Sequence, residues 1–337
     1  MADAAVPRPA ADRLRPALRF LGRRLLQALI VMLLVVLLNF SVLQLAPGDM
    51  ISVLSGSSDM TAEQMVSLRA QYGLDQPWLA RLGIYLFNLA QFDLGYSFRN
   101  AAPVATVIAE RFPTTLILVV ASVIVSLTVG TLMGVVAARR AGSLADLVLL
   151  AVALVFYATP SFVIAIVLIL TFGVTLGWLP IGGLVTVGAG LTGWAWLADL
   201  VAHLILPVIA LCTFYVAIYA RLARASMLEV SSLDYVRTAR AKGVPEWRVV
   251  YVHALRNALL PLVTMAGLQV SSLIGGAILV ETVFGLPGMG RTAYDAIFER
   301  DTNLLLGVMF VSALCVVLVS LVVDLLYVLL DPRVSLE

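Results

Sequence analysis

The stretch PTTLILVVASVIVSLTVGTLMGVVAA, residues 113–138, contains no charged side chain. A helix needs about 20 mostly apolar residues to cross the hydrocarbon core of a membrane, so this stretch is long enough to span it. Four others qualify at once, at 25–46, 147–173, 257–280 and 303–323, and the last continues in apolar sequence to Leu330. A further one, 200–220, is interrupted only by His203. The sequence therefore predicts an all-α integral membrane protein with six transmembrane helices.

The composition supports a membrane protein. Of the 337 residues, 61% are apolar and 12% are charged, and the mean hydropathy is +1.02. A soluble domain is nearer half apolar and a quarter charged. This composition excludes an ordinary soluble enzyme, a disordered chain and a disulfide scaffold. The net charge of +2 indicates no polyanionic partner, and we expect no nucleic acid to bind.

The uncharged stretch 147–198 is too long for one span and could hold two. Its second half begins with the turn sequence Gly177-Trp-Leu-Pro180 and continues with several glycines and two more tryptophans. Tryptophan is enriched at the headgroup level of membranes. We interpret 174–199 as an interfacial loop, since a seventh span would also move the seven basic residues of 221–256 to the outer side.

The basic residues predict the orientation, because cytoplasmic loops of membrane proteins are enriched in Lys and Arg. With six spans, sixteen of these residues fall on the side of both termini and six on the other side. We expect a cytoplasmic segment 1–24, an uncleaved first helix 25–46, a large external loop region 47–112, a five-helix core 113–330 with an inner segment 226–256, and a cytoplasmic tail 331–337. The loop 47–112 is either a solvated cap on the bundle or a docking surface for an external partner.

The inner segment 226–256 has the pattern of a helix, a break and a second helix. Asp234 is a candidate N-cap, and Gly243 suits the left-handed position that ends a helix. Pro245 can open the next helix. The pattern predicts a short bent element on the cytoplasmic face, although an ordinary basic loop with a turn would also fit.

Several stretches resemble the dipeptide/oligopeptide/nickel-type permeases, the membrane subunits of binding-protein-dependent ABC importers. On the inner face they are Arg224-Ala-Ser-Met-Leu-Glu-Val230, Asp234-Tyr-Val-Arg-Thr-Ala-Arg-Ala-Lys-Gly243 and His253-Ala-Leu-Arg-Asn-Ala-Leu-Leu-Pro261. Two more are Glu281-Thr-Val-Phe-Gly-Leu-Pro-Gly-Met-Gly290 and Asp324-Leu-Leu-Tyr-Val-Leu-Leu-Asp-Pro-Arg333. The B-type member of the permease pair is indicated by the large first outer loop and by Ala46-Pro-Gly-Asp49, Tyr72-Gly-Leu-Asp75 and Asp93-Leu-Gly-Tyr-Ser97.

The resemblance implies a type I ABC importer permease fold in a bacterial cytoplasmic (inner) membrane, surrounded by lipid. It implies four kinds of partner: a homologous second permease subunit, two cytoplasmic ATPase subunits, and an external substrate-binding protein. ATP and Mg would be bound by the ATPase subunits, because this chain has no phosphate-binding Gly-x-x-x-x-Gly-Lys-Ser/Thr sequence and needs no cofactor of its own. Di- and oligopeptides are the expected substrates, and nickel, glutathione or sugars are alternatives within the family.

Two sets of residues are candidates for function under this resemblance. The ATPase-coupling set lies at the inner break and consists of Arg237, Thr238, Ala239, Arg240, Lys242 and Gly243. Polar side chains within spans are candidates for the translocation pathway, although small residues there also serve helix packing. They are Tyr157, Thr159, Ser161, Gln269, Ser271, Ser272 and Asp324. Glu281 and His203, near outer span ends, are expected to reach only interfacial water.

Two other classes of protein remain as alternatives. An ion-coupled secondary transporter would normally carry several ionisable groups deep in its spans and an internal repeat, whereas only Asp324 is a fair candidate here. A membrane enzyme would need a nucleophile with a base or a metal cluster. The two histidines, His203 and His253, are expected on opposite sides of the membrane, so we predict neither catalytic residues nor a metal site.

Overall fold

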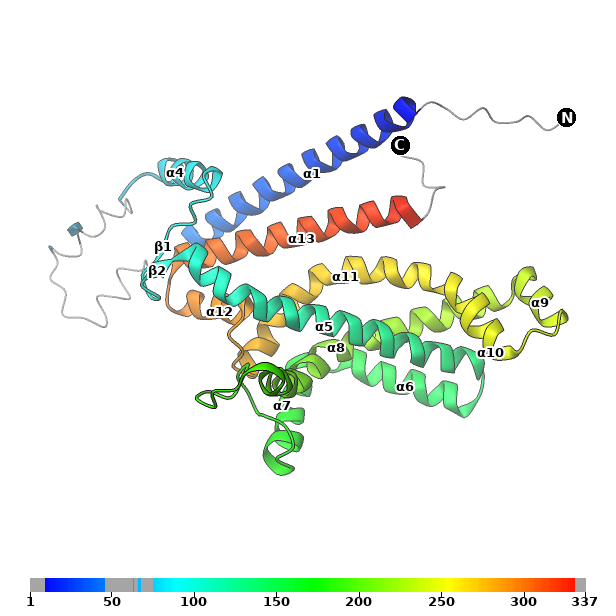
Figure 1. Ribbon diagram of the computed structural model, residues 1–337. Helices are drawn as coiled ribbons and strands as arrows, with labels where there is room; N and C mark the ends of the chain where they lie inside the picture. The colour runs from blue at the N-terminus through cyan, green and yellow to red at the C-terminus, as the bar shows by residue number, and fades with distance from the viewer. Residues whose placement is uncertain (1–9, 46–62, 64–65, 68–74, 331–337) are drawn as a thin grey trace. The chain divides into compact units, whose positions relative to one another are not determined.

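The computed structural model describes residues 10–45, 63, 66–67 and 75–330 (Figure 1). The first nine residues of the expected cytoplasmic segment 1–24, most of the first part of the expected outer loop 47–112, up to residue 74, and the expected tail 331–337 lie outside these residues. The described chain is almost entirely helical, and its one small sheet pairs β1 (Tyr96–Ser97) antiparallel with β2 (Ala102–Pro103). The chain divides into two compact units, residues 1–87 with 309–337 and residues 88–308.

Five described helices are long and apolar enough to cross a membrane. They are α1 (Ala10–Leu45), α5 (Val104–Arg139), α8 (Gly193–Ser231), the helix that begins at Glu246, and α13 (Thr302–Leu330). A sixth is present if the bent pair α6 (Leu144–Ala158) and α7 (Ser161–Leu168, continued by the π-helical η1, Ile169–Thr175) counts as one span. The predicted all-α, multi-span architecture is confirmed.

The first unit contains α1 and most of α4 (Trp78–Ala90). Phe40 of α1 is buried and stacks on Tyr85 of α4 with ring centroids 5.4 Å apart. Trp78 at the start of α4 contacts the same phenylalanine ring at 6.4 Å. A short helix of the outer segment is therefore fixed to the end of the first span by aromatic packing.

The predicted span at 147–173 is present as two helices with a sharp bend between them. The chain bends by 102° between α6 and α7. Thr159 (φ −92°, ψ 123°) and Pro160 (φ −58°, ψ 140°) are both extended at the break. Proline lacks an amide hydrogen and pushes the residue before it out of the helical region, so the helix ends there instead of bending slightly.

Other helix bounds differ from the predicted ones. An apolar stretch marks only the part of a helix that crosses the hydrocarbon core, and the helix itself can extend beyond it. α5 begins at Val104, inside the segment predicted as an outer loop, and it accommodates Pro113 in its interior. α8 begins at Gly193, so the last part of the predicted loop 174–199 is helical, and it continues to Ser231. The remainder of that loop carries left-handed glycines, as its turn sequence predicts.

The centre of the second unit is the packing of α5 against α8. Gly130 and Gly134, one turn apart on α5, face the α8 backbone: a Cβ at Gly130 would lie 2.8 Å from the carbonyl oxygen of Val216, and one at Gly134 would lie 2.5 Å from that of Ala220. Small residues at this spacing let two membrane helices approach closely. Around this contact lies an apolar core that includes Leu118, Leu206 and Tyr219.

The chain from Glu246 to Val283 is helical without a break, through α10 (Glu246–Arg248), the π-helical turn η2 (Val249–Ala254) and α11 (Leu255–Val283). After α11 the chain turns back into α12 (Met289–Phe298), which Figure 1 shows beside the start of α5. At the other end of this long helix lies α9 (Asp234–Ala241), joined to α8 by a short turn. The predicted inner break thus connects two long spans directly.

Candidate functional site

The inner break forms an elbow, which we define as residues 234–248. Gly243 has φ +75°, the left-handed conformation predicted for it. Its amide donates to the carbonyl of Arg240 at 2.9 Å, and the amide of Val244 donates to the carbonyl of Ala239 at 3.2 Å. These two bonds constitute a Schellman motif, which satisfies the last carbonyls of α9. Asp234 differs from the prediction, because it is the first residue of α9 and Leu233 is the N-cap.

The elbow has two arms, α9 before Gly243 and the long helix that begins at Glu246 after it. Apolar contacts and an ion pair hold these two arms together. Val236 and Ala239 of α9 pack against Val249 of the second arm, and Val244 covers them. The guanidinium of Arg240 spans the bend to the carboxylate of Glu246, with Nη2 donating to Oε1 at 3.1 Å. This pair is solvent-exposed, so most of the rigidity comes from the buried contacts and the cap.

A second set of contacts fixes the elbow to the spans. The Tyr235 hydroxyl donates to the carbonyl of His253 at 3.3 Å and accepts from the Asn257 amide at 2.6 Å. Beneath them, Val250 and Ala254 pack against residues of α5 and α8, including Val135 and Met227. The elbow is therefore attached to α5, α8 and α11.

The six predicted coupling residues lie together on this element, as their spacing requires. Five are exposed and carry the basic and polar surface of the elbow: Arg237, Thr238, Arg240, Lys242 and Gly243. Ala239 is buried at 8% exposure and packs inside the elbow. A partner on the inner face would thus meet the five exposed residues, while Ala239 holds their backbone in place.

An ion pair that sequence reasoning missed lies beside the elbow. Arg224 of α8 binds Asp146 at the start of α6 through two parallel bonds of 2.7 Å, Nε to Oδ1 and Nη2 to Oδ2. Asp146 also accepts from the amide of Gly142 at 2.9 Å. Such bidentate pairs are geometrically specific. The turn between α5 and α6 is therefore fixed to the α8 segment that leads to the elbow.

The candidate pathway residues occupy two places. Tyr157, Thr159 and Ser161 surround the bend between α6 and α7, where Tyr157 stacks on Phe214 at 4.9 Å and lies under the guanidinium of Arg221 at 4.7 Å. Gln269 of α11 is buried, and its Oε1 has no hydrogen-bond partner among the described residues. Ser271 and Ser272 on α11 and Asp324 on α13 belong to these helices, but their side chains lie outside the described part of the chain.

The expectation that Glu281 and His203 reach interfacial water is wrong, because both are buried. Glu281, at the end of α11, accepts a hydrogen bond from the Thr115 hydroxyl at 2.6 Å and another from the Arg291 amide at 3.0 Å. The Met289 amide donates to the Thr115 oxygen at 2.8 Å. A carboxylate here satisfies free amides at the start of α12, as an N-terminal cap does. His203 instead contacts Asp199, whose carboxylate holds the loop residue Thr186.

The stretch Asp93–Ser97 packs against the corner between α12 and α13. The buried hydroxyl of Ser97 donates to Oδ2 of Asp301 at 2.6 Å, and Oδ1 of Asp301 accepts from the amide of Leu304 at the start of α13. The Asn303 amide donates to the carbonyl of Tyr96 at 3.2 Å. This part of the predicted outer loop is therefore integrated into the helical unit.

Among the described residues no group of three or more His, Cys, Asp or Glu side chains could hold a metal ion. The chemically distinctive features are instead the exposed basic elbow and the buried polar cluster around Glu281.

Comparison with known proteins gives a consistent result. The family described as "Binding-protein-dependent transport system inner membrane component" matches residues 130–336, and its N-terminal counterpart matches residues 17–119. The di/tripeptide transport system permease protein DppB of Pseudomonas aeruginosa is 40% identical, and the dipeptide transport system permease protein DppB of Escherichia coli K12 is 38% identical. In both cases the alignment covers 94% of this chain and 98% of the relative. A solved structure of the MetNI methionine ABC transporter in inward-facing conformations shows 19% identity and a TM-score of 0.48, over 66% of this chain and 92% of that one.

Proposed function

Because the chain belongs to the family of binding-protein-dependent transport system inner membrane components, we propose that it forms half of the pathway through which an ATP-driven importer takes up di- or oligopeptides. Members of this family are non-catalytic, multi-pass inner-membrane permeases of ABC transporters. The peptide assignment is supported by curated relatives, aligned over nearly the whole chain, that are peptide permeases.

The proposed complex contains a homologous second permease subunit, two cytoplasmic ATPase subunits and an external substrate-binding protein. ATP and Mg belong to the ATPases. Both termini and the elbow face the cytoplasm, and the part of residues 47–112 that precedes α5 faces outward. The excess of basic residues on the elbow side supports this orientation.

One observation carries the coupling role: the second arm of the elbow is continuous with a membrane span. The helix runs from Glu246 through η2 and α11 to Val283 without a break. The first arm, α9, follows α8 after a short turn. A displacement of the elbow by a closing ATPase is therefore transmitted to two spans at once.

This arrangement makes the transport step a shift between two conformations. ATPase closure favours one arrangement of α8 and α11, and its reopening favours the other, through differential contacts at the elbow. Arg237, Thr238, Arg240, Lys242 and Gly243 form the contact surface, and Ala239 holds it rigid. The chain itself does no chemistry.

The pathway is proposed to pass the polar residues at the α6–α7 bend and on α11, and Ser271, Ser272 and Asp324 remain candidates for its lining. Gln269 has the strongest support. A buried amide oxygen without a partner costs free energy unless another group binds it. The second permease subunit or a peptide amide can supply that donor.

The test is transport by the complex purified from its own membrane and reconstituted in vesicles with its external binding protein. Uptake of labelled dialanine should require ATP on the elbow side. Uptake that persists without the ATPases, driven by an ion gradient, would identify a secondary transporter and overturn the proposal. Mass spectrometry of the ligand released from the binding protein tests the substrate: a nickel complex, glutathione or a sugar would overturn the peptide assignment alone.

A further inference from the structure

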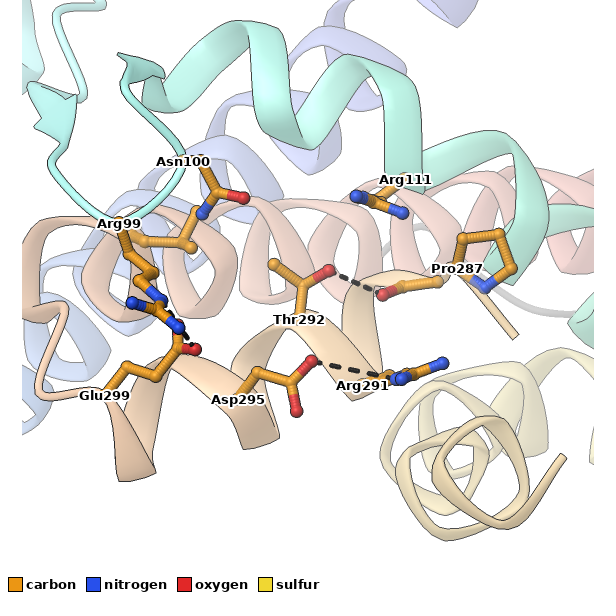
Figure 2. A pocket seen from close by; sticks show the side chains of 10 residues that line it. Arg99, Asn100, Arg111, Pro287, Arg291, Thr292, Asp295 and Glu299 are labelled. Carbon is orange, nitrogen blue, oxygen red and sulfur yellow. Dashed lines mark hydrogen bonds and ion pairs between the residues drawn. The ribbon is translucent and has the colours of Figure 1, made fainter. Parts of the chain in front are cut away.

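A cavity of about 310 Å³ lies between the loop of the β1–β2 hairpin, the start of α5 and α12 (Figure 2). Three of its lining residues are arginines and two are acids: Arg99, Arg111, Arg291, Asp295 and Glu299. All of them belong to the unit 88–308. The cavity is therefore a polar, positively charged depression in a single compact unit.

Two of the three arginines already have partners. Nε of Arg99 lies 3.0 Å from Oε1 of Glu299, and Nε of Arg291 lies 3.7 Å from Oδ2 of Asp295. Arg111 has no ion pair or hydrogen bond with any residue that the structure describes, and it is only partly exposed. The paired charges cancel, so the excess charge of the cavity is that of Arg111.

The guanidinium of Arg111 suits a carboxylate ligand. A guanidinium presents its N–H donors in a planar fork that matches the two oxygens of a carboxylate, and partial removal from water strengthens such a pair. The start of α12 is fixed by its amide bonds to Thr115 and Glu281, so a ligand need not order that wall of the cavity.

We infer that the cavity receives an acidic side chain of the external substrate-binding protein, which pairs with Arg111. This rests on the proposed function. The rim favours a protein partner over a substrate in transit, because the Arg99 side chain is 69% exposed and Glu299 is 34% exposed. None of the candidate pathway residues lines the cavity.

The cavity lies against α12, which is bonded to the end of α11, so docking in the cavity can affect this membrane-spanning helix. Arg291 and Thr292 belong to the first turn of α12, and the Arg291 amide donates to Glu281 at the end of α11. An acid that binds Arg111 therefore lies against the helix that is fixed to α11. Docking from outside and ATPase contact at the elbow thus act on opposite ends of the same long helix.

The experiment measures the affinity of the co-purifying binding protein for the complete complex in lipid nanodiscs. Arg111→Gln should weaken binding at least about tenfold, since a partly buried charge pair loses one partner, and binding should also become less sensitive to salt. Arg111→Lys should lie between Arg111→Gln and the unchanged protein. The matched control, Arg139→Gln at the other end of α5, should leave affinity unchanged. Gel filtration checks that each variant complex assembles.

A charge reversal identifies the partner acid. Arg111→Glu should abolish binding, and one Asp→Arg or Glu→Arg change on the binding protein should restore it. Unchanged affinity and salt dependence in Arg111→Gln would overturn the inference. A second result would also overturn the inference: a variant that docks normally but no longer takes up peptides with a free carboxylate, while it still takes up amidated peptides. In that case Arg111 would bind the substrate. If the unchanged complex binds no external protein at all, the proposed function itself fails.

Discussion

The hydroxyl of Thr115 in α5 donates a 2.6 Å hydrogen bond to the carboxylate of Glu281, which lies 166 positions later at the end of α11. The same threonine oxygen accepts from the amide of Met289, and the second carboxylate oxygen accepts from that of Arg291. Two spans and the start of α12 therefore meet at one buried polar cluster.

Replacement of Glu281 by Gln should destabilise this outer corner. The carboxylate accepts on both oxygens, whereas an amide must turn one NH2 group toward a donor. A buried polar mismatch of this kind costs about 1–3 kcal/mol. Thermal unfolding of the purified complex should show a lower Tm for Glu281→Gln and Thr115→Val. Thr115→Ser, which keeps the hydroxyl, should retain most of the stability, and an equal loss in Thr115→Ser and Thr115→Val would contradict the assignment.

Separation of Asp146 from Arg224 should destabilise the contact between α6 and α8 more than loss of an exposed pair does. Arg224→Lys should behave nearly as poorly as Arg224→Ala, because lysine cannot form the two parallel bonds. A double-mutant cycle on Asp146 and Arg224, followed by thermal unfolding, measures their coupling. The exposed pair Asp234 and Arg237, whose atoms lie 3.9 Å apart, is the control and should show almost no coupling. Similar values for the two cycles would contradict this prediction.

Gly243→Pro should leave the protein in the membrane and uncouple transport from ATP hydrolysis. Proline cannot adopt φ +75° and removes the amide that bonds to Arg240, so the Schellman motif is lost. Gly243→Ala keeps the amide and costs only about 1–2 kcal/mol of backbone strain, so it should retain part of the coupled transport. The measurement is the ratio of peptide taken up to ATP hydrolysed in vesicles. Normal uptake by Gly243→Pro would refute the coupling role.

Gly134→Ala should weaken the α5–α8 contact, because the added Cβ would meet the Ala220 carbonyl and the Ala223 side chain, each at 2.5 Å. Overpacking of this type costs about 1–3 kcal/mol. Gly22→Ala is a matched control, since nothing lies within 4 Å of a Cβ at that position in α1. Unfolding temperatures of the two variants in detergent should differ, with the loss confined to Gly134→Ala; equal temperatures would contradict the close contact.

The orientation can be checked with single cysteines in a background where Cys212 and Cys315 are replaced by Ala. Thr238→Cys should react with a membrane-impermeant maleimide only after the inner side is opened, because the proposed topology places the elbow in the cytoplasm. Asn100→Cys, in the outer hairpin loop, should react in intact cells. Labelling of Thr238→Cys from outside would reverse the proposed topology.

Local signals in the sequence were sufficient for the spans and the elbow. Apolar length marks a span regardless of its neighbours, and Gly243 ends a helix through its own backbone. The close contact at Gly130 and Gly134 was not predicted, because spacing along one helix does not identify the helix that packs against it. The sequence showed a proline at position 160 but not the size of the bend, because the sharpness of a break depends on the residues around it.

The polar pairs could not be predicted from spacing along the chain. Glu281 is buried because α5 and α12 fold over it, and Asp146 meets an arginine 78 positions away. Each partner alone resembles an ordinary charged residue at a helix end. The exposed charges of the elbow are of the same residue types and also lie near helix ends. Only the three-dimensional structure distinguishes the buried pairs from these exposed charges.

The cluster at Glu281 has a mechanical consequence. Because Thr115 of α5 bonds to both Glu281 and the Met289 amide, the turn between α11 and α12 can move without breaking these bonds only if this part of α5 moves with it. A change of conformation in the proposed transport cycle would then bend the chain more easily at Pro160, where the helix is already interrupted.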